Sequence, residues 1–455
     1  MVRFIALSVV IGMCSFSVLA QTLKFDTVSQ CHNSLSEPGM VVRLEQSDKL
    51  IYSGAIGIAD LKTMRQLQVD DVFQIGSITK TFTAAAIFKL LESNKLSLKD
   101  PVGKFIPNIN PHYKHLILEH ILSHTSGLPD YLDDPTVHKV WDEYASIEDV
   151  INRITKKPVQ SNPTEEYSYS NLGYILLGKV IEVASGLPYS AYLEEVFFKP
   201  LQMKNTFVMT KGLSVGNVQG YTTRDPAAKQ YIKAEKLISR SWKVDRSWIY
   251  SSGAIASTLA DMSRWNKALS SGEVITLQNF TLMATKTRLN SGKYIKYGLG
   301  LNIQPLATVD SLSHEGMVPG FLSWNVSFPE HNLFATAFSN ADTKHPGPML
   351  LDMIALQLKL SPEPLIDSQK VKQLAQKLVG RYQSSSSKVL TISLEGNTLY
   401  AQYGDDTKRK IIPREDSSFS NECTENYFQL RENAGKSEIV PIYLYQGEQE
   451  ALIKL

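Results

Sequence analysis

Cysteine is scarce in this chain, and neither sign of charge is in excess. The 455 residues include three cysteines, and 47 Lys and Arg nearly balance 45 Asp and Glu, which leaves a net charge of +2. This balance gives no basis for binding nucleic acid or an acidic membrane surface. Internal repeats are also absent, and a hydrophobic content of 43% is ordinary for a globular protein. The length predicts two to three domains.

Long apolar runs are absent once the first 20 residues have passed. Arg3 is followed by apolar and small residues that continue to Ala20, which is the pattern of a cleaved secretory signal. The run is short for a membrane span, and Met13 before Cys14 is not the small residue that lipid attachment prefers. We therefore predict a signal peptide over residues 1–20, a periplasmic or secreted protein, and no membrane span after signal removal.

Removal of this leader leaves two cysteines, Cys31 and Cys423. In an oxidising compartment the pair favours a disulfide, which would tie the mature N-terminus to the C-terminal region. Two unpaired thiols are the alternative, because the sequence does not give the distance between them.

The stretch around Ser77 joins a strand end, a tight turn and a helix. Residues 72–75 have the pattern of a buried strand, Gly76 supplies the turn, and the apolar residues of 77–93 predict a largely buried helix. Ser77 would then lie at a helix N-terminus with Lys80 on the same face. Backbone N–H groups there favour negative charge, and an ammonium of lowered pKa could accept the hydroxyl proton.

Two plainer interpretations apply to this Ser-x-x-Lys spacing. A serine at a helix start commonly serves as an N-cap. The spacing also recurs at Ser385 and Lys388, inside a polar serine run with no helical pattern after it.

Two further motifs follow at wide spacing. Tyr169-Ser170-Asn171 lies on a polar turn before a helix predicted over 172–184, and His314-Glu315-Gly316 lies on a late strand. Alone, each has an ordinary explanation: a packed tyrosine with a capping asparagine, or a chance His-x-Gly such as the one at 345–347.

Strand patterns flank a mostly helical region over 117–203, which implies one sheet built from distant pieces of the chain. Beyond a linker at 360–364, a short helix and alternating segments predict a small antiparallel β domain. The other segments expected are a hairpin at 41–52, helices at 147–154, 187–200, 349–358 and 371–379, and strands at 298–303, 321–328, 333–339, 389–394, 398–403, 427–430, 439–445 and 451–455.

In this order, the three motifs resemble those of the serine β-lactamase and penicillin-binding-protein superfamily, in its class C-like branch of β-lactamases, DD-peptidases, D-aminopeptidases and esterases. Segments 122–128, 250–254 and 258–262 resemble this branch as well. The resemblance implies an α/β (α+β) fold, with an antiparallel sheet flanked by helices and an all-helical region. The implied domains are 21–360 for the hydrolase, 361–370 for a linker and 371–455 for a lipocalin-like, barrel-like antiparallel β domain.

The resemblance also assigns catalytic roles. Ser77 matches the acylated nucleophile, and Lys80 and Tyr169 match the pair that shares its proton. Which of the two is the base stays open. Asn171 matches the residue that binds the substrate amide.

The third motif departs from the lactamase pattern. His314 replaces the usual lysine, Gly316 keeps the glycine, and the backbone N–H groups of Met317 and Ser77 would form the oxyanion hole. Glu315 would repel a substrate carboxylate if it pointed inward, although strand alternation equally allows it to point away. The resemblance therefore favours a peptidase or esterase over efficient β-lactam hydrolysis.

Two other classes compete with this interpretation. His112, His115, His120 and His124 could indicate a metallohydrolase, but no His-Glu-x-x-His is present, and we expect no metal and no cofactor. The second competing class is a sensor or penicillin-binding module that keeps the fold without efficient turnover. The expected partner is a small-molecule or peptide substrate, and the sequence does not fix the oligomeric state.

The two copies of Ser-x-x-Lys provide the first test. Ser77→Ala should abolish acylation, by at least about 10⁴-fold, because it removes the nucleophile, and it should leave folding intact. Ser385→Ala should change neither. Intact mass after incubation with a fluorescent penicillin or a p-nitrophenyl ester measures acylation, and circular dichroism measures folding. Acylation that survives in Ser77→Ala would contradict the assignment.

Overall fold

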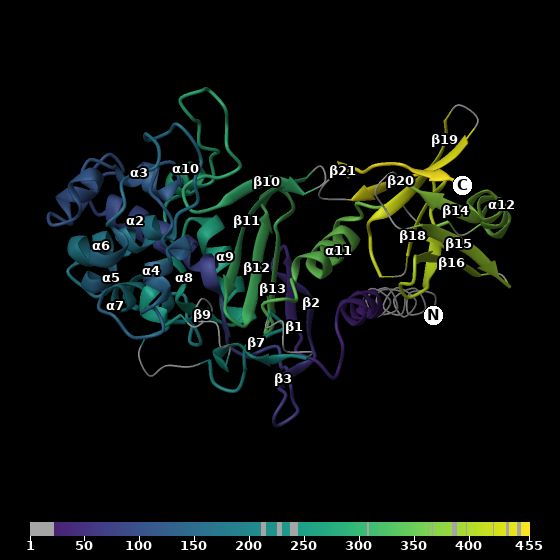
Figure 1. Cartoon of the computed structure of the whole chain (residues 1–455), viewed down its shortest axis with the longest axis horizontal. Helices are drawn as coiled ribbons and strands as arrows, with labels where there is room; N and C mark the ends of the chain where they lie inside the picture. The colour runs from purple at the N-terminus through teal and green to yellow at the C-terminus, as the bar shows by residue number, and fades with distance from the viewer. Residues whose placement is uncertain are drawn as a thin grey trace, which may run out of the picture. The chain divides into compact units, whose positions relative to one another are not determined.

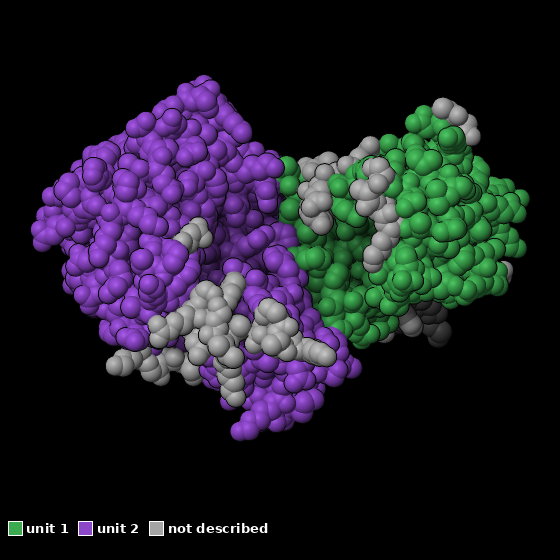
Figure 2. Space-filling view, in the orientation of Figure 1, with its two compact units in different colours: residues 1–33, 305–309, 347–455 green, residues 34–304, 310–346 purple. Residues whose placement is uncertain are grey.

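The computed structural model divides into two compact units, one of residues 34–304 and 310–346 and one of residues 1–33, 305–309 and 347–455 (Figures 1 and 2). The predicted leader and the pair Ser385 and Lys388 lie outside the described residues. The domain boundaries expected at 360 and 370 stay a prediction. The structure describes residues 22–210, 215–224, 230–236, 244–306, 309–362, 364–365, 367–384, 389–396, 398–421, 423–433, 436–443 and 447–455.

The larger unit contains an antiparallel sheet drawn from both ends of its sequence, as predicted. Its strand order is β10-β11-β12-β13-β1-β2, and Met40 of β1 lies opposite Ser339 of β13. The strands are β1 (Met40–Gln46), β2 (Lys49–Ile56), β10 (Asn302–Leu306), β11 (Val309–Val318), β12 (Phe321–Phe328) and β13 (Leu333–Ser339). The hairpin predicted over 41–52 is present, and its turn is Ser47 and Asp48, both with positive φ. One expectation needs correction: the strand predicted over 298–303 starts at Asn302, because Gly300 turns the chain with φ of +99°.

Helices pack on this sheet and form the helical region, and Figure 1 shows several of them gathered on one side of it. α2 is buried continuously from Thr79 to Phe88, as expected of a helix that is apolar all round. α6 ends at Ser185 and is followed by Gly186, whose φ of +78° is the left-handed geometry in which helices commonly end. The helix predicted over 187–200 is shorter, because a π-helical turn follows α7. These helices are α2 (Thr79–Glu92), α3 (Leu118–Leu122), α5 (Ile147–Ile154), α6 (Asn171–Ser185), α7 (Tyr189–Leu193), α8 (Tyr250–Gly253), α9 (Leu259–Ser271) and α10 (Leu277–Met283).

The smaller unit contains a closed antiparallel barrel of eight strands, because β19 pairs with both β18 and β20. Leu374 and Leu378 of α12 (Ser368–Leu378) belong to its core cluster, and α11 (Gly347–Leu358) is part of the same unit. Three of the eight strands, at 380–383, 409–413 and 418–421, were not predicted. The barrel strands are β14 (Gly380–Gln383), β15 (Leu390–Glu395), β16 (Thr398–Tyr403), β17 (Arg409–Pro413), β18 (Ser418–Asn421), β19 (Tyr427–Asn433), β20 (Lys436–Tyr443) and β22 (Leu452–Lys454).

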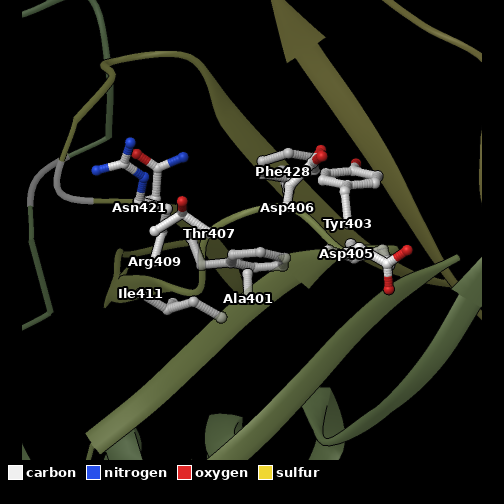
Figure 3. Close-up of a pocket in the computed structure, with 11 residues that line it drawn as sticks. Ala401, Tyr403, Asp405, Asp406, Thr407, Arg409, Ile411, Asn421 and Phe428 are labelled. Atoms are coloured by element: carbon white, nitrogen blue, oxygen red, sulfur yellow. The ribbon is translucent and has the colours of Figure 1, made fainter. Parts of the chain in front are cut away.

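A pocket of about 520 Å³ opens on this barrel (Figure 3). Its apolar lining includes Ile411 and the stacked rings of Phe419 and Phe428, whose centroids are 5.1 Å apart. Asp405, Thr407, Arg409 and Asn421 supply polar groups.

The structure joins Cys31, in a helix over residues 22–32, to Cys423, which follows β18. Their Cα atoms are 5.4 Å apart. Beside the disulfide, the buried Asp352 of α11 accepts hydrogen bonds from the Thr424 hydroxyl (2.7 Å) and the Glu425 N–H (2.9 Å). The disulfide therefore links two segments 392 residues apart in sequence within the smaller unit.

Replacing both cysteines by serine should destabilise this unit. A cross-link over so long a loop restricts the unfolded chain strongly, and removing a native disulfide typically costs about 2–5 kcal/mol. Differential scanning calorimetry of the Cys31→Ser, Cys423→Ser double variant should show a melting transition at lower temperature, and wild-type protein under reducing conditions should match it. Unchanged transitions in both would contradict a stabilising disulfide.

Candidate active site

The candidate nucleophile lies in a turn between a strand and a buried helix. β5 (Phe73–Gln74) ends at Gln74, a 3₁₀ turn spans Gly76–Ile78, and α2 begins at Thr79 rather than at Ser77 as predicted. Neither the turn nor α2 has a side-chain N-cap hydrogen bond. Ser77 is therefore not an N-cap, and its hydroxyl lies 3.1 Å from the Lys80 ammonium.

Lys80 is fully buried and has three oxygen partners. Besides Ser77 Oγ, its Nζ donates to Asn171 Oδ1 (2.7 Å) and to the carbonyl of Ser252 (2.8 Å). Burial lowers the pKa of Lys80 to about 7, although the Asp130 carboxylate opposes this shift. Near neutral pH the amine can therefore exist in both protonation states, as a group that accepts and returns a proton requires.

Tyr169 lies beside this pair, with its ring centroid 4.8 Å from Lys80 Nζ. Burial raises the pKa of Tyr169 far above its usual value, and a hydrogen bond with Ser77 opposes the shift only in part. The phenol is therefore protonated at neutral pH. The His124 ring packs against Tyr169 at 4.2 Å between centroids, and His124 Nδ1 accepts a hydrogen bond from the Ser170 N–H (3.1 Å). His124 thus holds the Tyr169 turn in place.

Asn171 is the first residue of α6, and its amide links two charged groups. Oδ1 accepts from Lys80, and Nδ2 donates to Asp130 Oδ2 at 2.8 Å. The substrate-binding role predicted for Asn171 would therefore depend on the remaining N–H of Nδ2.

The third motif supplies no positive charge. His314 is buried on β11, where Nδ1–H donates to the Glu315 carbonyl (2.7 Å) and Nε2 lies 3.0 Å from the Tyr297 hydroxyl. Burial, together with the nearby Lys80, lowers the pKa of His314 to about 4, so the ring is neutral at physiological pH. Glu315 points to the surface, where its ion pair with His345 (3.7 Å) lowers its pKa. Of the two orientations open to Glu315, the structure has the outward one.

Two glycines let strand β11 approach the nucleophile turn. A Cβ on Gly316 would lie 1.9 Å from the Ile75 carbonyl oxygen, and a Cβ on Gly76, whose φ is +51°, would lie 2.6 Å from Met317 N. The Ser323 hydroxyl donates to the same Ile75 oxygen at 2.8 Å. The Met317 N–H is thereby held against the turn that carries Ser77, as a two-donor oxyanion hole requires.

Four contributors to this site were not assigned to it from the sequence. The Ser252 carbonyl fell within a segment noted only for its resemblance, and Asp130 and Tyr297 carried no pattern at all. His124 was considered as a metal ligand but not as a partner of the Tyr169 turn. Asp130 follows Pro129 in a loop, and only the fold brings it to Asn171.

The histidines that suggested a metallohydrolase do not form a cluster in the described part of the chain, where no three histidine, cysteine or carboxylate side chains could hold a metal ion. His124 lies instead against Tyr169. Within the same ranges, none of the helices is both long enough and apolar enough to cross a bilayer.

A serine beside a buried lysine of lowered pKa and a protonated tyrosine defines a serine hydrolase that works through an acyl-enzyme. The Beta-lactamase family model matches residues 26–359, and the chain belongs to this family. It is 27% identical over 450 residues to penicillin-binding protein 4* of Bacillus subtilis (strain 168), with 95% of this chain and 97% of that protein covered.

Solved structures share the fold. The octameric penicillin-binding protein homologue from Pyrococcus abyssi superposes with a TM-score of 0.62 at 22% identity, covering 98% of this chain and all of that one (100%). The D-amino acid amidase from Ochrobactrum anthropi SV3 gives a TM-score of 0.64 at 21% identity, covering 75% of this chain and 98% of that one.

Gly316→Ala should lower kcat by displacing the backbone of β11, without removing any catalytic side chain. The new Cβ cannot fit against the Ile75 carbonyl, so β11 must move away from the turn and take the Met317 N–H with it. Loss of one oxyanion donor costs about 10²–10³-fold in kcat, and p-nitrophenyl ester hydrolysis measures it. Gly103→Ala is the control, because its Cβ would crowd the Lys114 carbonyl at 2.8 Å, away from the residues of this site. Equal losses in both variants would contradict the argument.

Proposed function

We propose that this protein is an exported serine hydrolase that cleaves amides or esters through an acyl-enzyme at Ser77, with D-amino-acid amides and peptides as the favoured substrates. The observation that carries the proposal is the buried Lys80, with Ser77 Oγ at 3.1 Å and a pKa near 7. A surface lysine would be protonated at neutral pH and could not accept the serine proton.

In the proposed first step, neutral Lys80 takes the Ser77 proton as Oγ attacks the substrate carbonyl. The two N–H groups of the amine already donate to Asn171 and Ser252, so the new ammonium has all three hydrogens bonded. The backbone N–H groups of Ser77 and Met317 would hold the oxyanion.

In the second step, the tetrahedral intermediate collapses and the bond to the leaving amine or alcohol breaks. Tyr169, whose phenol stays protonated, gives its proton to the leaving group and recovers one from the Lys80 ammonium. Water then attacks the acyl-Ser77 ester, one of its protons returns to Ser77 Oγ, and the acid product leaves. Lys80 rather than Tyr169 acts as the base in this scheme, because burial disfavours a phenolate far more than a neutral amine.

The substrate class is inferred from the third motif and from relatives. A neutral His314 cannot attract the carboxylate of a β-lactam as the lysine of a lactamase would, which favours substrates without that requirement. One relative at 27% identity is a penicillin-binding protein, and a structural neighbour is a D-amino acid amidase. A penicillin-binding protein or sensor that acylates without efficient turnover is the alternative function.

Export is supported by two features. The first 20 residues have the charge and apolar pattern of a secretory signal. A structural disulfide such as Cys31–Cys423 forms and persists in an oxidising compartment. Both features support the proposal that the mature protein lies in the periplasm or outside the cell.

The test compares matched substrates on one enzyme preparation. D- and L-phenylalanine amide, a p-nitrophenyl ester and a fluorescent penicillin would each be incubated with wild type and with Ser77→Ala, and product release and intact mass followed together. We expect multiple turnovers of the D-amide or the ester, at least tenfold selectivity for the D- over the L-amide (about 1.4 kcal/mol), and no activity in Ser77→Ala. A lasting penicillin adduct without turnover would establish the alternative, and no reaction with any reagent would refute both.

A further inference from the structure

Both carboxylate oxygens of Asp130 accept hydrogen bonds, and one of them comes from the active site. Oδ2 accepts from Asn171 Nδ2 at 2.8 Å, and Oδ1 accepts from the Leu132 N–H at 3.3 Å. Asn171 in turn presents Oδ1 to Lys80 at 2.7 Å. A continuous chain therefore runs from the Asp130 carboxylate through one amide to the lysine beside Ser77.

We propose that Asp130 is a positioning residue for acylation: its carboxylate fixes the Asn171 amide so that Oδ1 faces Lys80, and its charge offsets the ammonium that forms when Lys80 takes the Ser77 proton. This role rests on the proposed function, because it concerns acyl transfer at Ser77.

The fixed amide orientation follows from hydrogen-bond chemistry. Burial raises the pKa of Asp130, while its hydrogen bonds from Leu132 and Asn171 and the nearby Lys80 oppose this shift and favour the carboxylate. A carboxylate only accepts, so it can bind the NH₂ end of Asn171 and not the oxygen end. If the Asn171 amide were reversed, its NH₂ group would face the donors of Lys80 and its oxygen would face Asp130, and two favourable contacts would become repulsive. Asp130 therefore selects the one rotamer in which Asn171 accepts from Lys80.

Among the groups packed around Lys80, Asp130 is the one that adds negative charge. Tyr169 and Tyr174 place their rings 4.8 and 5.5 Å from Nζ, and burial raises the pKa of both phenols, so they stay neutral. His124 and His314 also face the lysine, and burial lowers their pKa values, so both rings are neutral. The Asp130 carboxylate alone raises the pKa of Lys80 against the effect of burial.

Asp130 also has an ordinary structural role, which the experiment must separate from its proposed role in acylation. Its Oδ1 caps the 3₁₀ turn Tyr131–Asp133. Asp134 is a matched control, because it caps the next helix through the Thr136 N–H (2.9 Å) and pairs with Lys157 (3.0 Å), with no contact to Asn171 among its hydrogen bonds and ion pairs in the described residues. Loss of a cap alone should affect both variants alike.

The experiment compares Asp130→Asn, Asp130→Glu and Asp134→Asn in the mature protein. Acylation by a p-nitrophenyl ester is measured against pH, and the Lys80 side chain is titrated directly by NMR of protein labelled with ¹³C at lysine Cε, with Lys80→Arg to assign the signal. In wild type, acylation should rise with pH through about 7, the value to which burial lowers the pKa of Lys80, because the neutral amine is the base.

Asp130→Asn should lower the acylation plateau about 10- to 100-fold through misplacement of the reacting groups. The asparagine has one acceptor oxygen and cannot serve both Leu132 and Asn171. With the negative charge gone, the midpoint of the pH profile and the NMR titration should both move to lower pH. Asp130→Glu keeps the charge but changes the distances, so its plateau should fall while its midpoint stays nearer to that of wild type. Asp134→Asn should match wild type in both the acylation plateau and the midpoint of the pH profile.

An unchanged plateau and midpoint in Asp130→Asn, or equal losses in Asp134→Asn, would overturn the proposal. If wild type fails to react with any substrate, the proposed function fails, yet the NMR titration still reports whether Asp130 controls the protonation of Lys80. The two failures are therefore distinguishable.

Discussion

Burial of the Lys80 amine is the constraint on which the catalytic unit depends. An ammonium removed from water is costly unless acceptors replace its hydration. Here the acceptors come from three places far apart in sequence, the turn at Ser77, the start of α6 at Asn171 and the carbonyl of Ser252 in α8. The remaining cost appears as the lowered pKa, which is what makes the lysine useful as a base. Packing and reactivity thus have one physical origin.

Strand β11, which completes the site, can approach the Ser77 turn because glycines lie at the point of contact. Gly76 and Gly316 permit an approach that any Cβ would block, and the Ser323 hydroxyl bonds the Ile75 carbonyl at the point of contact. On the same strand, His314 turns inward to Tyr297 while Glu315 turns outward to His345. Strand alternation therefore separates a neutral structural histidine from a surface carboxylate, and neither provides the cation that a lysine would supply at this motif.

The local sequence was sufficient to predict the bounds of a helix or strand where its apolar pattern and the turn residues beside it agreed. The bounds of α5, β12 and β13 match the predicted ranges, since each has regular apolar spacing between clear turn residues. The local sequence was insufficient where tertiary contacts determine whether a segment forms a strand or a residue joins the site. The short barrel strands β17 and β18 are too polar to stand out, and Asp130 looks like any loop aspartate until the fold places it beside Asn171. Ser77, Lys80 and Tyr169 could be grouped only through family likeness, because spacing does not fix distance.

The order of the strands also constrains when activity can begin. β1 lies between β2 and β13, and the Met317 N–H of the proposed oxyanion hole belongs to β11, so the sheet and that site both need chain that is synthesised some 270 residues after β1. A partly made chain has the serine and the lysine but no strand to oppose them. The strand order therefore delays activity during synthesis. A hydrolase of this design cannot react with acyl compounds until nearly all of its catalytic domain has left the ribosome.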